Sequence, residues 1–155
     1  MKIDNSMSLH ILPLEQAHVK DVFSIELQAH THPWSLSLIE SIDGRGACHR
    51  VLLDKNNKVV GYFYAQNILG EVTLLNIAVD PKYHGSGYGK VLLNAFLDMC
   101  SNHDAESAWL EVRESNHRAY TLYEAAGFNE VDRRKSYYPT SNGKEDAIIM
   151  SYLFF

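Results

Sequence analysis

Apolar residues recur along this chain at two spacings, and in the N-terminal third they predict one strand and two helices. Residues 8–13 have the pattern of a strand, and residues 14–30 carry apolar side chains close to helical spacing. Pro33 ends that helix, because proline lacks the backbone N–H that a helix requires. A second, short helix is predicted over residues 35–42, with a serine cap before it and glycines after it.

The middle of the chain predicts strands. Residues 51–53 and 59–68 form two apolar runs, and the polar turn residues between them indicate a hairpin. Residues 71–79 form a nearly continuous apolar run, which is typical of a strand buried on both faces. The helix that follows buries a wide apolar stripe over residues 91–99.

The C-terminal third repeats the strand and helix order. A strand is predicted over residues 107–113 and a helix over 116–126, with Gly127 just past its end. A last strand is predicted over residues 147–154. The expected order is strand, two helices, three strands, helix, strand, helix and one or two strands, with no internal repeat.

Length and composition favour one globular domain over residues 8–155, preceded by a loose extension at residues 1–7. The hydrophobic fraction of 46% and the charged fraction of 21% are ordinary for a soluble protein. No apolar run approaches the roughly 20 residues that span a bilayer, so we expect no membrane association. The first residues lack the features of a signal peptide, which favours the cytoplasm. Separately, a monomer is the expected oligomeric state.

The formal charge is −5, and no block of Lys and Arg marks a nucleic-acid footprint. An acidic surface of this kind favours a cationic partner instead. Cys48 and Cys100 have no metal-ligand spacing, so we expect two reduced thiols and no metal site.

A glycine-rich turn, residues 84–90, joins the third of the middle strands to the long helix. Gly85, Gly87 and Gly89 permit close backbone approach, and backbone N–H groups and the positive end of the helix dipole converge there. This arrangement predicts a pyrophosphate site, and a turn without any ligand is the alternative. The spacing and the following valine do not match the Walker or dinucleotide patterns.

A second constellation joins the strand at 107–113 to the helix at 116–126. Glu111 stands near the end of the strand, and Asn116 and Tyr123 lie two turns apart on one helix face. Each has an ordinary alternative role: a surface carboxylate, a helix cap and a core tyrosine, respectively.

These motifs together resemble the Gcn5-related N-acetyltransferases (GNAT). His84-x-x-Gly87-x-Gly89 is similar to the family's acetyl-CoA loop, Gln/Arg-x-x-Gly-x-Gly/Ala, with His84 in place of Gln or Arg. Residues 110–128 are similar to the second half of the family signature, Leu-Glu-Val-Arg-x-x-Asn-x-x-Ala-x-x-Leu-Tyr-x-x-x-Gly-Phe. The resemblance implies an α/β (α+β) fold: a mixed, mostly antiparallel twisted sheet of about six to seven strands with about four helices.

The family's site residues map onto this chain. The resemblance implies Glu111 as catalytic base and Tyr123 as catalytic acid. It also implies a backbone N–H near Val79, freed by a bulge in that strand, as a donor to the oxyanion. Acetyl-CoA is the implied co-substrate, transferred directly without an acetyl-cysteine. The implied contacts with it are Ile77, Ala78, Val79, Gly85, Ser86, Gly87, Tyr88, Gly89, Lys90 and Asn116.

Further segments, at residues 29–35, 75–79, 109–113 and 137–150, resemble the bacterial RimI group of ribosomal-protein-alanine N-acetyltransferases. That resemblance implies the N-terminal alanine of the eighteenth small-subunit ribosomal protein as substrate. The alternatives are another amine, such as a lysine side chain, a polyamine or an aminoglycoside, or a non-catalytic acetyl-CoA sensor.

Residues that could bind the substrate peptide are aromatic or acidic. Trp34, Tyr137 and Tyr138 are expected in irregular segments near element ends, either as peptide contacts or as hydrophobic caps on the core. Glu26, Glu145 and Asp146 could face a basic peptide, or could simply solvate the surface.

Overall fold

A computed structural model describes residues 8–154. The extension predicted at residues 1–7 lies outside the described residues. The strands of the described part form a seven-stranded sheet in the order β1-β2-β3-β4-β5-β7-β6. All neighbours are antiparallel except β4 and β5, which are parallel. The predicted mixed, mostly antiparallel sheet is therefore confirmed. The strands are β1 His10–Pro13, β2 Arg50–Leu53, β3 Val59–Ile68, β4 Glu71–Val79, β5 Ser107–Arg113, β6 Asn129–Thr140 and β7 Gly143–Leu153.

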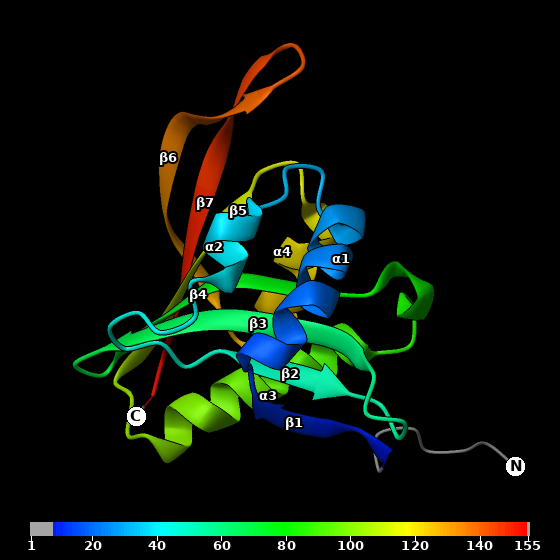
Figure 1. Ribbon diagram of the computed structural model, residues 1–155. Helices are drawn as coiled ribbons and strands as arrows, with labels where there is room; N and C mark the ends of the chain where they lie inside the picture. The colour runs from blue at the N-terminus through cyan, green and yellow to red at the C-terminus, as the bar shows by residue number, and fades with distance from the viewer. Residues whose placement is uncertain (1–7, 155) are drawn as a thin grey trace, which may run out of the picture.

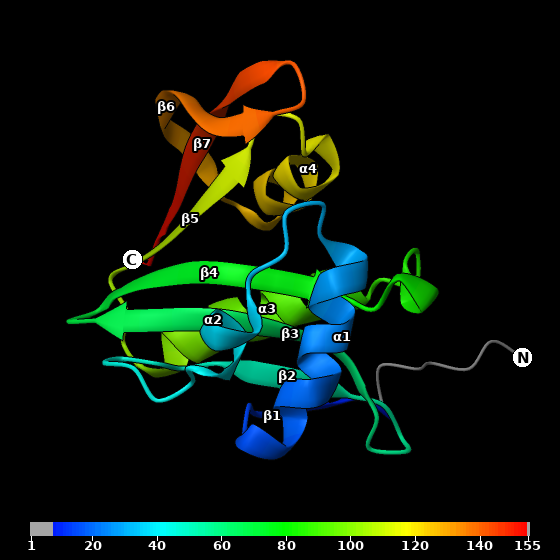
Figure 2. The ribbon, with the colours of Figure 1, turned by 45° about the horizontal axis from the view of Figure 1, so that its top comes forward.

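Helices cover both faces of the sheet (Figures 1 and 2). Alternate residues of β3 separate two cores, because successive side chains of a strand point to opposite faces. Tyr62 and Tyr64 pack with α1 and α2, whereas Phe63 and Ala65 pack with α3 and the buried face of α4. The helical elements are η2 Gln16–His18, α1 Val19–Ala29, α2 Leu36–Glu40, η3 Pro81–Tyr83, α3 Tyr88–Asn102 and α4 His117–Ala126.

Strands β4 and β5 pair for only part of their length. Their register runs from Glu71 opposite Ser107 to Leu74 opposite Leu110 and then stops. Figure 2 shows the two strands diverging beyond this point. The prediction of a strand buried on both faces is therefore wrong for β4: burial alternates along it, and Leu75 is 45% exposed.

The β-bulge expected in β4 is present, but it lies before the Val79 region in which the freed N–H was expected. In the pairing with β3, Tyr64 faces Asn76 and Ala65 faces Leu74, so Leu75 is the extra residue. The register then continues without a break to Val79 opposite Gly61. The bulge therefore lies four residues before Val79, directly where β4 leaves β5.

Two other boundaries were predicted imprecisely. The helix expected over residues 14–30 is divided into the short turn η2 and α1. The C-terminal hairpin is longer than expected: β6 is a full strand, and β7 begins at Gly143, before the predicted start at residue 147. Nearly all of β6 is exposed, so no apolar alternation marks it in the sequence. Among residues 8–154, no helix is long and apolar enough to cross a membrane.

Candidate active site

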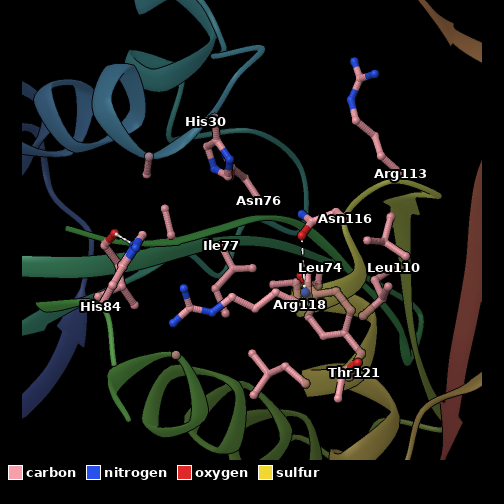
Figure 3. Close-up of a pocket in the computed structure, with 18 of the residues that line it drawn as sticks. His30, Leu74, Asn76, Ile77, His84, Leu110, Arg113, Asn116, Arg118 and Thr121 are labelled. Atoms are coloured by element: carbon pink, nitrogen blue, oxygen red, sulfur yellow. Dashed lines mark hydrogen bonds between the residues drawn. The ribbon is translucent and has the colours of Figure 1, made fainter. Parts of the chain in front are cut away.

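The divergence of β4 and β5 opens a cavity of about 780 Å³. Its walls come from the segment after α1, from β4 and β5, from the glycine-rich loop and from α4 (Figure 3). Tyr138 of β6 closes one side. Segments far apart in the sequence therefore meet around one space, and most of the predicted site residues lie on its walls.

The glycine-rich loop has the backbone conformation that its sequence predicts. Gly85 and Gly87 have φ values of +85° and +87°, which side chains disfavour, and no atom lies within 4 Å of a Cβ built on either. Gly87 is the N-cap of α3, a helix of 15 residues, so the positive end of its dipole faces the cavity. The loop thus presents open backbone at a helix N-terminus, as an anion site requires.

Two loop side chains make contacts within the chain. Ser86 does not line the cavity, and its hydroxyl donates to the carbonyl oxygen of Tyr83. The imidazole Nε2 of His84 lies 3.0 Å from the carbonyl oxygen of Val79 and donates to it. His84 therefore ties the loop to the end of β4. The remaining predicted loop residues, Gly85, Gly87, Tyr88, Gly89 and Lys90, line the cavity.

The other predicted coenzyme residues also line this cavity. Ile77, Ala78 and Val79 follow the bulge on β4. Asn116 lines the cavity. It also has its alternative role as a helix cap, since its Oδ1 accepts the backbone N–H of Ala119 at 3.2 Å.

Both oxygens of Glu111 are already in contact with donors. The hydroxyl of Tyr138 donates to Oε2 at 2.8 Å, and Nε of Arg134 lies 3.3 Å from Oε1. The guanidinium of Arg113 stacks 4.2 Å above the Tyr138 ring. Burial, together with the hydrogen bond to Glu111, raises the pKa of Tyr138 above its usual range. Glu111 is therefore a positioned carboxylate, not an isolated surface one.

Tyr123 is buried, with 7% of its surface exposed, and its ring packs edge-on against Phe128. It nevertheless lines the cavity together with Glu111. Burial raises the pKa of Tyr123 to about 12, so the phenol keeps its proton at neutral pH. Tyr123 therefore has both of the roles that the sequence allows: it packs in the core, and it also lines the cavity.

Of the three aromatic residues expected to contact the peptide, two line the cavity and one does not. Trp34 lines the cavity and also packs edge-on against Tyr64, with 5.3 Å between ring centroids. Tyr137 is 50% exposed and does not line the cavity. Contrary to the expected irregular segment, Tyr137 and Tyr138 belong to strand β6, beside a break in its register with β7.

Glu26 is a buried acid, contrary to both expectations for it, since facing a peptide and solvating the surface each require an exposed carboxylate. It is 1% exposed and accepts three hydrogen bonds, from the Tyr62 hydroxyl, the Asn76 amide and the backbone N–H of Trp34. A sequence signal for this burial exists, because Glu26 follows the buried Val22 by four residues on α1.

The two other acids have partners near the site. Glu145 accepts from the backbone N–H and the hydroxyl of Ser115, and these bonds lower its pKa. Asp146 accepts the backbone N–H of Ser136, which lowers its pKa, and lies 3.5 Å from Nζ of Lys135. Glu145 therefore ties β7 to the segment between β5 and α4, and Asp146 ties β7 to β6.

Comparison with known proteins identifies the fold and its chemistry. The profile of the acetyltransferase (GNAT) family matches residues 19–128, which include the loop, Glu111 and Tyr123. The chain belongs to this family. Acetyltransferases of this family use acetyl-CoA. The family's glycine-rich signature corresponds to residues 84–89, which lie at the open N-terminus of α3 on the cavity wall.

Individual relatives and solved structures are similar to this chain over most of its length. The chain is 41% identical, over 91% of its length and 96% of the relative, to the [ribosomal protein bS18]-alanine N-acetyltransferase of Haemophilus influenzae. The crystal structure of the ribosomal-protein-S18-alanine N-acetyltransferase from Escherichia coli superposes with a TM-score of 0.89 at 41% identity, covering 94% of this chain and 93% of that one. A spermidine N-acetyltransferase from Vibrio cholerae shares the fold, with a TM-score of 0.80 at 20% identity over 95% and 94% of the two chains.

Proposed function

We propose that this protein transfers the acetyl group of acetyl-CoA to the N-terminal alanine of ribosomal protein bS18. The observation that carries this proposal is the 41% identity to the Haemophilus influenzae enzyme of that name, over nearly the full length of both chains. The spermidine N-acetyltransferase shares only the fold, so the fold by itself does not choose among amines. A ribosomal substrate also agrees with the expected cytoplasmic location.

In this proposal acetyl-CoA occupies the cavity between β4 and β5. Its pyrophosphate lies on the backbone N–H groups of the loop from Gly85 to Lys90, at the N-terminus of α3. Its pantetheine arm follows Ile77, Ala78 and Val79, and Asn116 contacts it from α4. Because Gly85 and Gly87 leave open space above the loop, a phosphate can approach the backbone closely.

The thioester carbon then lies near the bulge at Leu75. A bulge leaves its extra residue outside the strand ladder, so a backbone N–H of this segment is available to the oxyanion that forms during attack. This replaces the position near Val79 that the family resemblance suggested. The bulge supplies the donor without any movement during the reaction, which is the condition for efficient electrostatic stabilisation.

Glu111 acts as general base toward the amine and Tyr123 as general acid toward the departing thiolate. A peptide α-amine has a pKa of about 7.7–8.0, so roughly one molecule in ten is free base near neutral pH. Tyr123 holds its proton at that pH because burial raises its pKa to about 12. Transfer is direct in a ternary complex, since burial raises the pKa of the Cys100 thiol to about 12 and Cys48 does not line the cavity.

One experiment separates this proposal from its alternatives. The purified protein is incubated with acetyl-CoA and a peptide beginning Ala-Arg, beside the same peptide with a blocked N-terminus and an added lysine. Mass spectrometry should show one acetyl group on the first peptide and none on the second. Acetylation of the blocked lysine peptide would favour a side-chain acetyltransferase, and coenzyme binding without any acetylation would favour a sensor.

A further inference from the structure

His30 ends a hydrogen-bond network that begins at the buried carboxylate of Glu26. Oε1 of Glu26 accepts from the Tyr62 hydroxyl at 2.6 Å and from Nδ2 of Asn76 at 2.8 Å. Oε2 accepts the backbone N–H of Trp34 at 2.9 Å. On the other side of the amide, Oδ1 of Asn76 lies 2.9 Å from Nε2 of His30. Figure 3 shows His30, which directly follows α1, beside Asn76 of β4.

This network determines which nitrogen of His30 carries a proton. The Glu26 carboxylate is an acceptor, so the Asn76 atom facing it is the amide nitrogen and the atom facing His30 is the amide oxygen. Because an amide oxygen only accepts, Nε2 of His30 must donate. The lone pair of the neutral ring is then on Nδ1. Among residues 8–154 no hydrogen bond to Nδ1 is present, and the half-buried ring lines the cavity.

The proposed reaction removes two protons from the substrate nitrogen. The α-amine arrives mostly as an ammonium group, which must lose a proton before its nitrogen can attack. Attack forms the N–C bond and leaves a second excess proton on nitrogen, and the C–S bond then breaks to release a thiolate. Tyr123 returns one proton to that sulfur, so two protons leave the nitrogen, one is consumed and one reaches solvent. A single carboxylate would have to accept both in turn.

Glu111 can hold only one of the two protons at a time. Each of its oxygens already contacts one donor, from Tyr138 or Arg134, and keeps a lone pair for a proton of the substrate. His30 lines the same cavity and has an unoccupied lone pair fixed by Asn76. An imidazole is also the side chain that most often serves as a general base in enzymes.

We propose that His30 is a second catalytic base, which accepts the first proton of the substrate's α-ammonium group on Nδ1, while Glu111 accepts the proton lost after attack. The assignment rests on the proposed acetyl transfer and extends it. Oε1 of Glu26 on α1 lies 3.6 Å from Nε2 of His30. The other ionisable side chains that line the cavity with His30 are His32, Tyr83, His84, Tyr88, Lys90, Glu111, Arg113, Arg118, Tyr123 and Tyr138. Nε2 of His30 stays with Asn76 throughout, and proton exchange uses only the cavity side.

The test is the pH dependence of kcat/KM for the Ala-Arg peptide with wild type and His30→Gln. Glutamine keeps an N–H that can reach Asn76 but has no basic nitrogen. We expect a loss of about 10²-fold below the α-amine pKa of about 7.7–8.0 that shrinks above it, where the substrate is already deprotonated. His103→Gln, an exposed histidine at the end of α3, is the matched control and should behave as wild type.

A second variant separates proton transfer from a structural effect. His30→Ala should regain part of its lost rate when imidazole is added, because the small base can occupy the vacated space. A loss equal at every pH and without imidazole rescue would overturn the assignment, as would an unchanged rate in His30→Gln. Failure of wild type to acetylate any α-amine would instead overturn the proposed function itself, so the two failures are distinguishable.

Discussion

The Tyr138 hydroxyl donates to Oε2 of Glu111 across 2.8 Å, which joins the edge hairpin to the proposed catalytic base. Tyr138 comes from β6 and Glu111 from β5, with β7 lying between these strands in the sheet. The contact reaches past the intervening strand because β6 loses its regular register with β7 between Arg134 and Tyr138. The hairpin is thus part of the active-site wall as well as the edge of the sheet.

Tyr138→Phe should lower kcat about tenfold without changing acetyl-CoA affinity. The phenyl ring can keep its stacking with Arg113, but the hydrogen bond to Glu111 is lost. A hydrogen bond to a charged group contributes about 1.5 kcal/mol or more, which corresponds to roughly tenfold in rate. Steady-state kinetics and coenzyme titration check this, with Tyr137→Phe as the neighbouring control. An unchanged kcat would mean that Tyr138 does not position the base.

Glu111→Gln should lower kcat by about 10²–10⁴-fold at neutral pH with little effect on acetyl-CoA binding. The substitution preserves the shape of the side chain and removes its ability to accept a proton. The loss should persist above the α-amine pKa of about 7.7–8.0, because the proton assigned to Glu111 is lost only after attack, whereas the loss in His30→Gln should shrink there. Kinetics at several pH values test this, and an unchanged rate near pH 7 would exclude Glu111 as the base.

Gly89→Val should weaken acetyl-CoA binding at least tenfold while leaving the protein folded. Its backbone lies in the first turn of α3 at an ordinary φ, and a Cβ there would meet only Leu122 at 3.6 Å. The remaining methyl groups project into the proposed pyrophosphate site. Calorimetric titration measures the affinity, with Gly44→Val as control, since nothing lies within 4 Å of a Cβ at Gly44. Wild-type affinity in Gly89→Val would move the coenzyme elsewhere.

Gly87→Val should weaken binding too, but it also strains the fold. The residue has a φ of +87°, a conformation that costs a branched side chain about 1–3 kcal/mol. A fall in thermal stability is therefore expected together with the loss of coenzyme affinity. A variant with full stability would show that the loop relaxes to another conformation.

Local patterns in the sequence predict those parts of the site that lie along one element or its turn. The apolar run of β4, the glycines after it and the spacing of Asn116 and Tyr123 on α4 all correspond to positions on one cavity. These features depend on residues close together in the chain. Helical and strand periods therefore carry enough information to locate them.

The missed contacts join residues far apart in the sequence. Glu26 bonds to residues 36 and 50 positions away, and Tyr138 reaches Glu111 over 27 positions. The position of the bulge at Leu75 was also missed, because it depends on how β4 pairs with β3. Strand β6 is exposed on both faces, so its sequence has no apolar period to predict it.

Glu26→Ala should destabilise the fold by about 3 kcal/mol or more. It leaves three donors without their acceptor: the Tyr62 hydroxyl, the Asn76 amide and the Trp34 backbone N–H. An unsatisfied buried donor costs about 1–3 kcal/mol. Tyr62→Phe, which removes one donor and leaves the carboxylate its other two, should cost about 1 kcal/mol. Urea unfolding measures both, and equal effects would argue against a shared network.

Tyr123→Phe should lower kcat about 10²-fold, since phenylalanine keeps the packing against Phe128 but has no proton for the thiolate.

Burial raises the pKa of Tyr123 to about 12, so the neutral phenol is favoured in the folded state. The associated stability is fully present below the ordinary tyrosine pKa of about 10 and is lost as pH rises from there toward 12. Wild-type kcat should therefore show no decline due to Tyr123 up to about pH 10, whereas the free energy of unfolding should fall more steeply above pH 10 than in Tyr123→Phe. Rate profiles and urea unfolding over this range provide the check. A decline of kcat centred below pH 10 that is present in wild type and absent in Tyr123→Phe would contradict a buried, protonated acid at this position.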